Sequence, residues 1–265
     1  MTEPQAMSPA PTPNFLKPRR RQYFEILLVL GLSLGASAIY SIVSIINKST
    51  ASVPLASQST TITTSLSSRP YFDLIYQLLA IFFDLVPVML VLYLLWLPGR
   101  SAFSRIGLDA RRPGKDLLSG LALAAVVGIP GLGLYFAAHA LGINVEIRPT
   151  DLSTYWWTFP VLVLVALRAA LQEEVIMIGY LFTRLRELGW RDWPIIVTSA
   201  AIRGTYHLYQ GFGSFLGNFA MGILFGYFYK RFGRTTPLVV THFILDLVSF
   251  VGYALLVAAI PGFKL

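Results

Sequence analysis

The sequence contains no cysteine and few charged side chains. Without cysteine, the chain forms no disulfide bond, no Cys-ligated zinc site and no thiol nucleophile. Charged residues make up 13% of the chain, about half the ~25% of a soluble globular protein. Because 55% of the residues are hydrophobic and occur in long runs, the composition indicates a membrane protein.

The positive charge of the chain has an explanation other than nucleic-acid binding. The formal net charge of +8 would favour a nucleic-acid partner in a soluble protein. Here the Lys and Arg residues gather in short segments between hydrophobic runs. We therefore expect the lipid bilayer, and no nucleic acid, as the surroundings of the chain.

Seven hydrophobic segments predict an all-α fold, a polytopic membrane helix bundle of about seven transmembrane helices. They cover residues 24–46, 73–97, 117–141, 159–183, 194–209, 213–230 and 236–260. A crossing helix needs about 20 apolar residues, so the fifth and sixth segments are short. Residues 1–22, rich in Pro and ending in a basic run, predict a disordered cytoplasmic tail, and residues 23–265 predict a single membrane domain. The Ser/Thr-rich stretch 47–71 predicts a flexible loop.

Lys and Arg also predict the orientation. With the N-terminus inside, the inner segments hold fifteen of the 21 Lys and Arg residues and the outer segments hold four. Loops rich in Lys and Arg stay on the cytoplasmic side of a membrane. The sequence therefore predicts a multi-pass protein of the cell membrane, with a cytoplasmic N-terminus and an outer C-terminus.

A few ionisable side chains fall within the predicted spans. A charge near the bilayer centre costs roughly 2.5–3.5 kcal/mol, so such residues face a cavity or a partner and are functional candidates. Seven of the eight lie in the fourth, fifth and seventh spans; the full set is Asp84, Arg168, Glu173, Glu174, Arg203, His207, His242 and Asp246.

The spacing of these residues predicts shared helix faces. Arg203 and His207 are four residues apart, as are His242 and Asp246, so each pair lies on one face. Glu173 and Glu174 are adjacent, about 100° apart around a helix, and we expect only one to face the site while the other contacts a supporting group. Two histidines and a carboxylate from separate helices suit activation of water or ligation of a metal.

Structural interpretations stand beside the functional ones. Intramembrane Glu and His side chains also tie helices together by hydrogen bonds. Asp84 fits a helix-packing or cavity residue, Arg168 a structural counter-charge, and His139 an interface residue. Asp246 could act only by orienting His242. Glycines spaced four apart in 213–226 indicate close helix packing.

Three motifs resemble those of a known family. They are Leu171-Gln-Glu-Glu-Val-Ile-Met-Ile-Gly-Tyr180, Arg203-Gly-Thr-Tyr-His207 and His242-Phe-Ile-Leu-Asp246. In this order, on separate membrane helices, they resemble the E-E-x-x-x-R, F-x-x-x-H and H-x-x-x-N/D motifs of the CPBP family. These are the CAAX-protease and bacteriocin-processing (ABI-type) intramembrane proteases, related to the CAAX prenyl endopeptidase. The resemblance covers roughly residues 155–255.

The resemblance implies hydrolysis of a peptide bond at or in the membrane, on a membrane-associated peptide or protein substrate. It implies that Glu173, supported by Glu174, activates a water shared with His207, and that His242 and Asp246 stabilise the oxyanion. This is the glutamate-type endopeptidase, although the family is often labelled metalloendopeptidase. We expect no firm cofactor, because no H-E-x-x-H spacing is present. The alternative is zinc held by Glu173, His207 and His242.

Two positions depart from the family pattern. The motif arginine is replaced by Ile178, and the motif phenylalanine by Arg203. They favour an alternative function, a non-catalytic membrane scaffold or a bacteriocin-immunity-type protein of the same fold. A third possibility is a transporter that uses the charges as a proton or ion relay. The lack of an internal repeat and of helix pairs broken by Gly or Pro argues against a transporter.

The depths of the candidate residues predict an irregular fifth span. Upright helices would hold Glu173, His207 and His242 at depths that differ by about 10 Å, too far for shared chemistry. We therefore expect a short, tilted fifth span and a turn at 210–213 that lies below the outer surface and lines the cavity. Arg203 would then point into the same cavity as a supporting residue and replace the arginine missing at Ile178.

Overall fold

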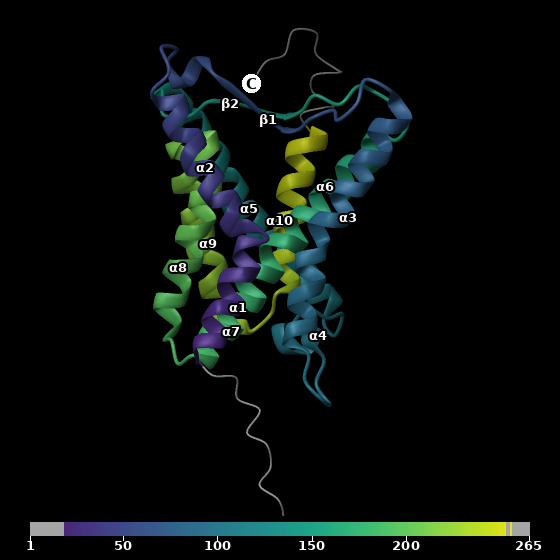
Figure 1. Ribbon diagram of the computed structural model, residues 1–265, viewed down its shortest axis with the longest axis vertical. Coiled ribbons are helices and arrows are strands. Elements are labelled where there is room, and N and C mark those ends of the chain that lie inside the picture. Colours follow the sequence, from purple (N-terminus) through teal and green to yellow (C-terminus); the bar gives the residue numbers. More distant parts are fainter. Residues whose placement is uncertain (1–18, 253–254, 256–265) are drawn as a thin grey trace, which may run out of the picture.

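The computed structural model describes residues 19–252 and residue 255, and these residues are mostly helical (Figure 1). The longer helices run along the bundle, and two short strands lie across one end of it (Figure 1). The elements in chain order are α1 (Arg19–Gly31), α2 (Leu34–Ser49), η1 (Leu55–Ser57), β1 (Ser59–Thr63), α3 (Pro70–Leu95), α4 (Ala102–Ile106), α5 (Pro113–Ala140), β2 (Glu146–Thr150), α6 (Thr158–Glu173), η2 (Glu174–Tyr180), α7 (Leu181–Glu187), α8 (Asp192–Tyr206), η3 (Leu208–Gln210), α9 (Phe212–Phe232), α10 (Thr236–Leu247) and η4 (Val248–Gly252).

Within the described residues, each predicted hydrophobic span coincides with helical structure, although the number of crossings stays a prediction. Residues 253–254 and 256–260 of the seventh span lie outside the described residues. Among the described residues, two helices are long and apolar enough to cross a membrane, α3 and α5. A third is added if α1 and α2, which are bent by 57° at their junction, count as one broken span. The bend lies within the segment 24–46, which the sequence predicts as one hydrophobic span. The helix α1 begins at Arg19, so it includes the last four residues of the predicted tail, and residues 1–18 lie outside the described residues.

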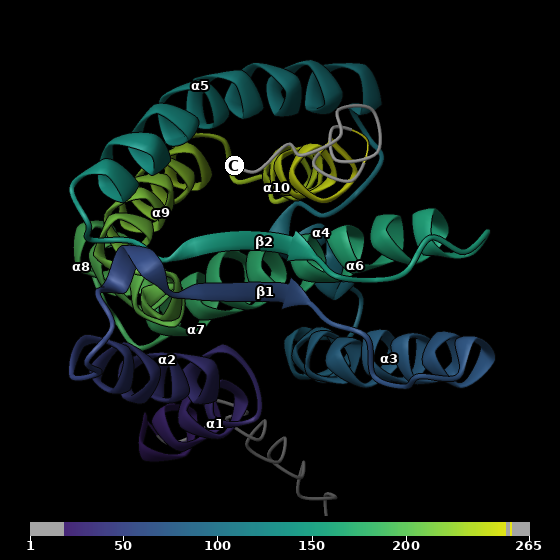
Figure 2. The same ribbon diagram turned by 90° about the horizontal axis from the view of Figure 1, so that it is seen from above.

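A two-stranded parallel sheet replaces part of the loop predicted over 47–71. The strand β1 pairs with β2, with Ser59 opposite Glu146 and Thr63 opposite Thr150. Seen from above, the strands cross over the bundle, with α3 and α5 on opposite sides of α6 (Figure 2). The prediction of a loop was wrong here because the hydrogen-bond partner of β1 lies more than 80 residues away along the chain.

The apolar core surrounds η2. Every residue of this π-helical segment is buried, and most of its side chains belong to one cluster with residues of α3, α4, α8 and α9. A π-helical turn within an α-helix is uncommon and is found mostly at functional sites. The core therefore fixes the segment that carries the acidic motif.

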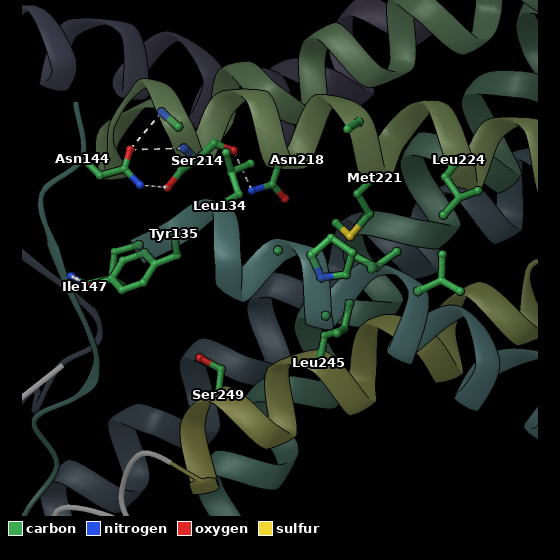
Figure 3. Close-up of a pocket in the computed structure, with 18 residues that line it drawn as sticks. Leu134, Tyr135, Asn144, Ile147, Ser214, Asn218, Met221, Leu224, Leu245 and Ser249 are labelled. Atoms are coloured by element: carbon green, nitrogen blue, oxygen red, sulfur yellow. Dashed lines mark hydrogen bonds between the residues drawn. The ribbon is translucent and has the colours of Figure 1, made fainter. Parts of the chain in front are cut away.

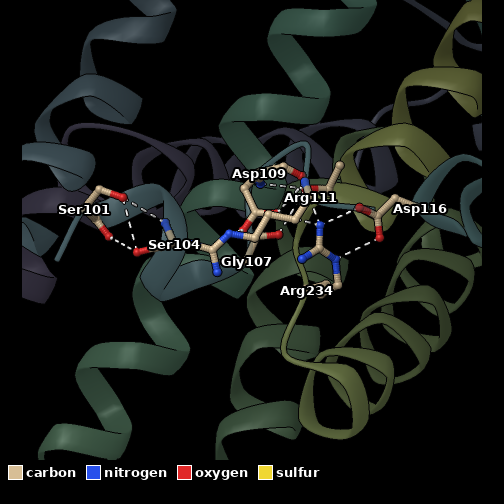
Figure 4. Close-up of polar contacts among 8 residues, drawn as sticks. Ser101, Ser104, Gly107, Asp109, Arg111, Asp116 and Arg234 are labelled. Atoms are coloured by element: carbon tan, nitrogen blue, oxygen red, sulfur yellow. Dashed lines mark hydrogen bonds and ion pairs between the residues drawn. The ribbon is translucent and has the colours of Figure 1, made fainter. Parts of the chain in front are cut away.

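A polar cluster at the end of the bundle opposite the two strands positions α10 (Figure 1). Arg234, just before α10, donates from Nε to Asp116 Oδ1 at 2.8 Å and from Nη2 to Asp109 Oδ1 at 3.0 Å (Figure 4). Thr235 Oγ1 donates to the carbonyl of Ile106 at 2.6 Å. Although partial burial raises the pKa of Asp109, hydrogen bonds from the Arg111 backbone and Arg234 hold that pKa below its usual value. These contacts fix the start of the helix that carries His242.

Candidate active site

The acidic pair lies where α6 passes into η2. Glu173 is the last residue of α6 and Glu174 the first of η2. Glu174 is fully buried, and Glu173 is 9% exposed. A buried carboxylate requires partners, and the helices α8 and α10 supply them.

The helix α8 supplies Arg203, Tyr206 and His207. Arg203 and Tyr206 lie in its last turn, and His207 is its C-terminal cap. Close packing against α9 is possible because residue 204 is glycine, where a Cβ atom would come within 3.0 Å of the Phe215 carbonyl oxygen. The helix has only 15 residues, about 22 Å, which is shorter than the ~30 Å hydrocarbon core of a bilayer.

The chain turns sharply after His207. Leu208–Gln210 forms a 3-10 turn, and Gly211 has φ of 119°, a conformation that glycine adopts without strain. The backbone of Gln210 accepts from Val145 at 3.1 Å, and Phe212 donates to Ile143 at 2.9 Å. The turn predicted at 210–213 is thus present at 208–211, while Phe212 and Gly213 begin α9, and Gln210 is buried. Its depth in a bilayer stays a prediction.

Arg203 lies between the two glutamates. Its Nη2 donates to Glu174 Oε1 at 2.6 Å, and its Nη1 is 3.6 Å from Glu173 Oε2. The guanidinium also lies over the Phe225 ring, 5.3 Å from the centroid. The side chain is fully buried. These distances confirm the expected position of Arg203 beside the two glutamates.

Glu173 faces the other side of the same cluster. Tyr206 Oη donates to Glu173 Oε2 at 2.6 Å, and His207 Nε2 lies 3.9 Å from that oxygen. The distance to His207 is too long for a direct hydrogen bond and suits a bridging water. Tyr206 was missed by the sequence analysis. The only sequence feature that marks Tyr206 is its position beside His207 within the second motif.

His242 joins the cluster from α10. Its Nδ1 is 2.8 Å from Glu174 Oε1, and its Nε2 is 3.5 Å from Asp246 Oδ2. Both nitrogens face carboxylate oxygens, an arrangement that suits an imidazolium with two N–H donors. The contact with Asp246 fits the prediction that this residue orients His242.

The expectation that Glu173 and Glu174 could not share one centre was wrong. One oxygen of each carboxylate and one nitrogen of His242 lie within 4.8 Å of one another. Glutamate has a long side chain, and Arg203 from α8 draws both carboxylates toward one guanidinium. The predicted site residues Glu173, Glu174, His207, His242, Asp246 and Arg203 therefore belong to one continuous chain of contacts.

Several polar atoms of the cluster have no hydrogen-bond partner among the described residues. They are Glu174 Oε2, Arg203 Nε and Nη1, and both ring nitrogens of His207. Buried polar atoms are normally paired with protein or water. The unpaired atoms therefore mark where a water or a substrate group would be held.

The other intramembrane candidates lie outside this network of contacts. Arg168 forms an ion pair with Asp84 at 3.4 Å, which links α6 to α3, and contacts Gln172 at 3.3 Å. This agrees with the prediction of a counter-charge and a packing residue. His139 stacks on Tyr135 in α5, with ring centroids 6.3 Å apart.

Comparison with known proteins agrees with the three motifs. Residues 155–248 match the family model described as type II CAAX prenyl endopeptidase Rce1-like. The resemblance to the CAAX-protease family is confirmed. The matched segment contains all six predicted site residues. No curated protein and no solved structure matches the chain.

Proposed function

We propose that the chain is a CAAX-protease-type endopeptidase that hydrolyses a peptide bond at or in the membrane. The family match supports a peptidase whose substrate is a membrane-associated peptide or protein. The observation that carries the mechanism is the 3.9 Å gap between Glu173 Oε2 and His207 Nε2. A water held by both groups lies within hydrogen-bond reach of each.

In this mechanism Glu173 is the general base. The water gives a proton to the Glu173 carboxylate while its oxygen attacks the scissile carbonyl, and the proton then passes to the leaving amine. Tyr206 holds the carboxylate in place through its hydrogen bond of 2.6 Å to Oε2. General acid–base catalysis of this kind contributes about 10²–10⁴-fold in rate.

Two positive groups are available to the oxyanion. His242 Nε2 lies 3.5 Å from Asp246, a contact long enough for a substrate oxygen to replace. Arg203 keeps Nη1 and Nε without hydrogen-bond partners among the described residues. Donors aimed at developing charge in a buried site are worth roughly 2.7–4 kcal/mol each. We assign the oxyanion to His242, with Arg203 balancing the charge of the two glutamates.

We propose that the reaction needs no metal, because the side chains fit a zinc ion poorly. Within the described residues, the three groups close enough to ligate a metal are Glu173, Glu174 and His242, whereas the zinc alternative used His207 in place of Glu174. Glu174 Oε1 already accepts from Arg203 at 2.6 Å and lies 2.8 Å from His242 Nδ1. A guanidinium between the carboxylates would also repel a second cation.

The experiment compares purified wild type with Glu173→Gln on lipid-anchored and transmembrane peptides. We expect the variant to lose about 10²–10⁴-fold in cleavage rate while it stays folded and inserted. Asp84→Asn is the matched control, since it makes the same acid-to-amide change on α3 outside the cluster, and its rate should stay near that of wild type. Full cleavage by Glu173→Gln would overturn the role of Glu173. A wild type that binds these peptides without cutting them would favour the scaffold function.

A further inference from the structure

The structure contains a cavity that the proposed chemistry does not use. It lies between α5, α9 and α10, has a volume of about 580 Å³, and has 18 lining residues, none of them among the predicted site residues (Figure 3). Cavities of roughly 300–1,000 Å³ hold small organic ligands. The cavity is therefore large enough for a ligand of its own.

Small residues in α5 and α9 open this space. Gly128, Gly131, Gly213 and Gly217 all line it. A Cβ atom at residue 131 would meet nothing within 4 Å, and one at residue 217 would approach only a Leu134 methyl group, at 3.2 Å. The lack of a side chain at residue 131 therefore leaves part of the cavity empty, and a larger residue there would project into it.

The lining specifies the chemistry of an occupant. None of the lining residues carries a charge, and most are apolar. The polar ones include Tyr135, Asn218 and Ser249. Asn218 Nδ2 donates to the Ser214 carbonyl at 3.0 Å, while among the described residues no donor reaches Asn218 Oδ1. Figure 3 shows Asn218 of α9 and Ser249 of η4 on facing sides of the space between these helices. An uncharged hydroxyl-bearing group would satisfy them.

The position of the cavity along α5 indicates that its ligand comes from the lipid bilayer. Its wall on α5 runs from Val126 to Tyr135, within a helix long and apolar enough to cross a membrane. The solvent at that level is lipid hydrocarbon. A phospholipid headgroup carries a phosphate, for which this lining offers no cation. A neutral lipid with one chain and a hydroxyl headgroup matches both the apolar walls and the uncharged polar groups.

We propose that this cavity is a binding site for a neutral single-chain lipid from the bilayer, of the monoacylglycerol type. The chain lies along Val126–Leu134 and Met221, and the hydroxyl headgroup bonds Asn218 and Ser249. The site is separate from the proposed peptidase chemistry, so its test needs no turnover. Failure of that test leaves the peptidase proposal untouched.

The test is photolabelling of the full chain in phospholipid nanodiscs, free of detergent. The probes are a diazirine-bearing monoacylglycerol and a diazirine-bearing phosphatidylglycerol, and adducts are mapped on the protein. We expect the neutral probe to label residues 126–135 and 214–221 saturably. Labelling there by the anionic two-chain probe at equal strength would make this an ordinary lipid-facing surface and overturn the proposal.

Two glycines of α5 provide a matched pair of variants. Gly131→Phe fills the cavity, whereas Gly133→Phe places the same side chain in open space on a residue that does not line it. We expect Gly131→Phe to abolish the saturable labelling and Gly133→Phe to retain it. Equal labelling of both variants would refute the site.

A third variant tests the headgroup contact without filling the cavity. Asn218→Leu removes the amide, so the preference for the hydroxyl probe over a matched methyl ether should fall roughly 2–10-fold, the worth of one hydrogen bond. Unfolding temperatures near that of wild type establish that the variants are folded. An unchanged preference in a folded Asn218→Leu would contradict the assigned headgroup contact.

Discussion

Replacing Arg203 by methionine tests whether one guanidinium holds the acidic pair together. Methionine keeps the length and most of the volume of the side chain, so little of the effect comes from an empty cavity. The substitution removes the 2.6 Å contact with Glu174 and the 3.6 Å contact with Glu173. It leaves two buried carboxylates beside each other, with His242 still in contact with Glu174.

The expected loss is large because the side chain is fully buried. Removing one partner of a buried ion pair costs about 3–5 kcal/mol, and we expect Arg203→Met to destabilise the fold by about that amount. The matched control is Arg186→Met in α7. Arg186 pairs with Asp192 at 2.8 Å, but both side chains are about a third exposed, and such a pair contributes less than ~1 kcal/mol.

The assay is equilibrium unfolding in detergent of a double-variant cycle with Glu174→Gln. If Arg203 neutralises Glu174, the double variant should be more stable than the sum of the single losses by about 1–3 kcal/mol. Cleavage should fall in Arg203→Met even under conditions where the variant stays folded. A coupling energy near zero, or a loss no larger than that of Arg186→Met, would refute the reasoning.

The remaining predictions concern the general base, the metal and the polar cluster that contains Asp109. Tyr206→Phe removes one hydrogen bond to Glu173, so kcat should fall roughly 10-fold or more with KM and unfolding temperature nearly constant; an unchanged kcat would contradict the positioning role. Chelation by phenanthroline, with zinc content measured in parallel, should leave cleavage intact; loss of activity that zinc restores would favour the metal alternative. For Asp109, whose folded pKa is lowered, the contribution to stability is present above the unfolded pKa of ~3.9 and is lost as pH falls through the folded pKa. The difference in unfolding temperature between wild type and Asp109→Asn should therefore narrow from pH 6 to pH 3; a constant difference would exclude this titration.

The sequence predicts the contents of the site better than the shape of the fold around it. Helix periodicity places Arg203 with His207, and His242 with Asp246, on shared helix faces. Because a charge within a membrane span is costly, each of these residues is a candidate for a functional role. The pairing of Arg203 with the glutamates followed from a depth argument. Tyr206 was missed because an aromatic residue within a span is ordinary, and only the fold brings its hydroxyl to Glu173.

The irregular parts of the fold depend on contacts distant along the chain. The strand β1 has no alternation of apolar and polar residues, and its partner β2 contains Pro149, so neither segment predicts a strand alone. The bend between α1 and α2 occurs at Leu32-Ser33, without proline, and Ser33 Oγ bonds the Val29 carbonyl at 2.6 Å. The π-helical register of η2 has no local signature either.

The position of the arginine has a consequence for how this chain assembles its site. In the family pattern the arginine would stand at residue 178, four residues after Glu174 in the same helical segment. Here Ile178 is fully buried in the apolar cluster around η2, and the guanidinium comes from α8. The charge of the acidic pair is then balanced only when α8 is docked against α6 and η2. The same docking brings Tyr206 and His207 to Glu173. A single helix contact therefore completes both the charge balance and the water-binding pair, so loosening α8 should remove both together.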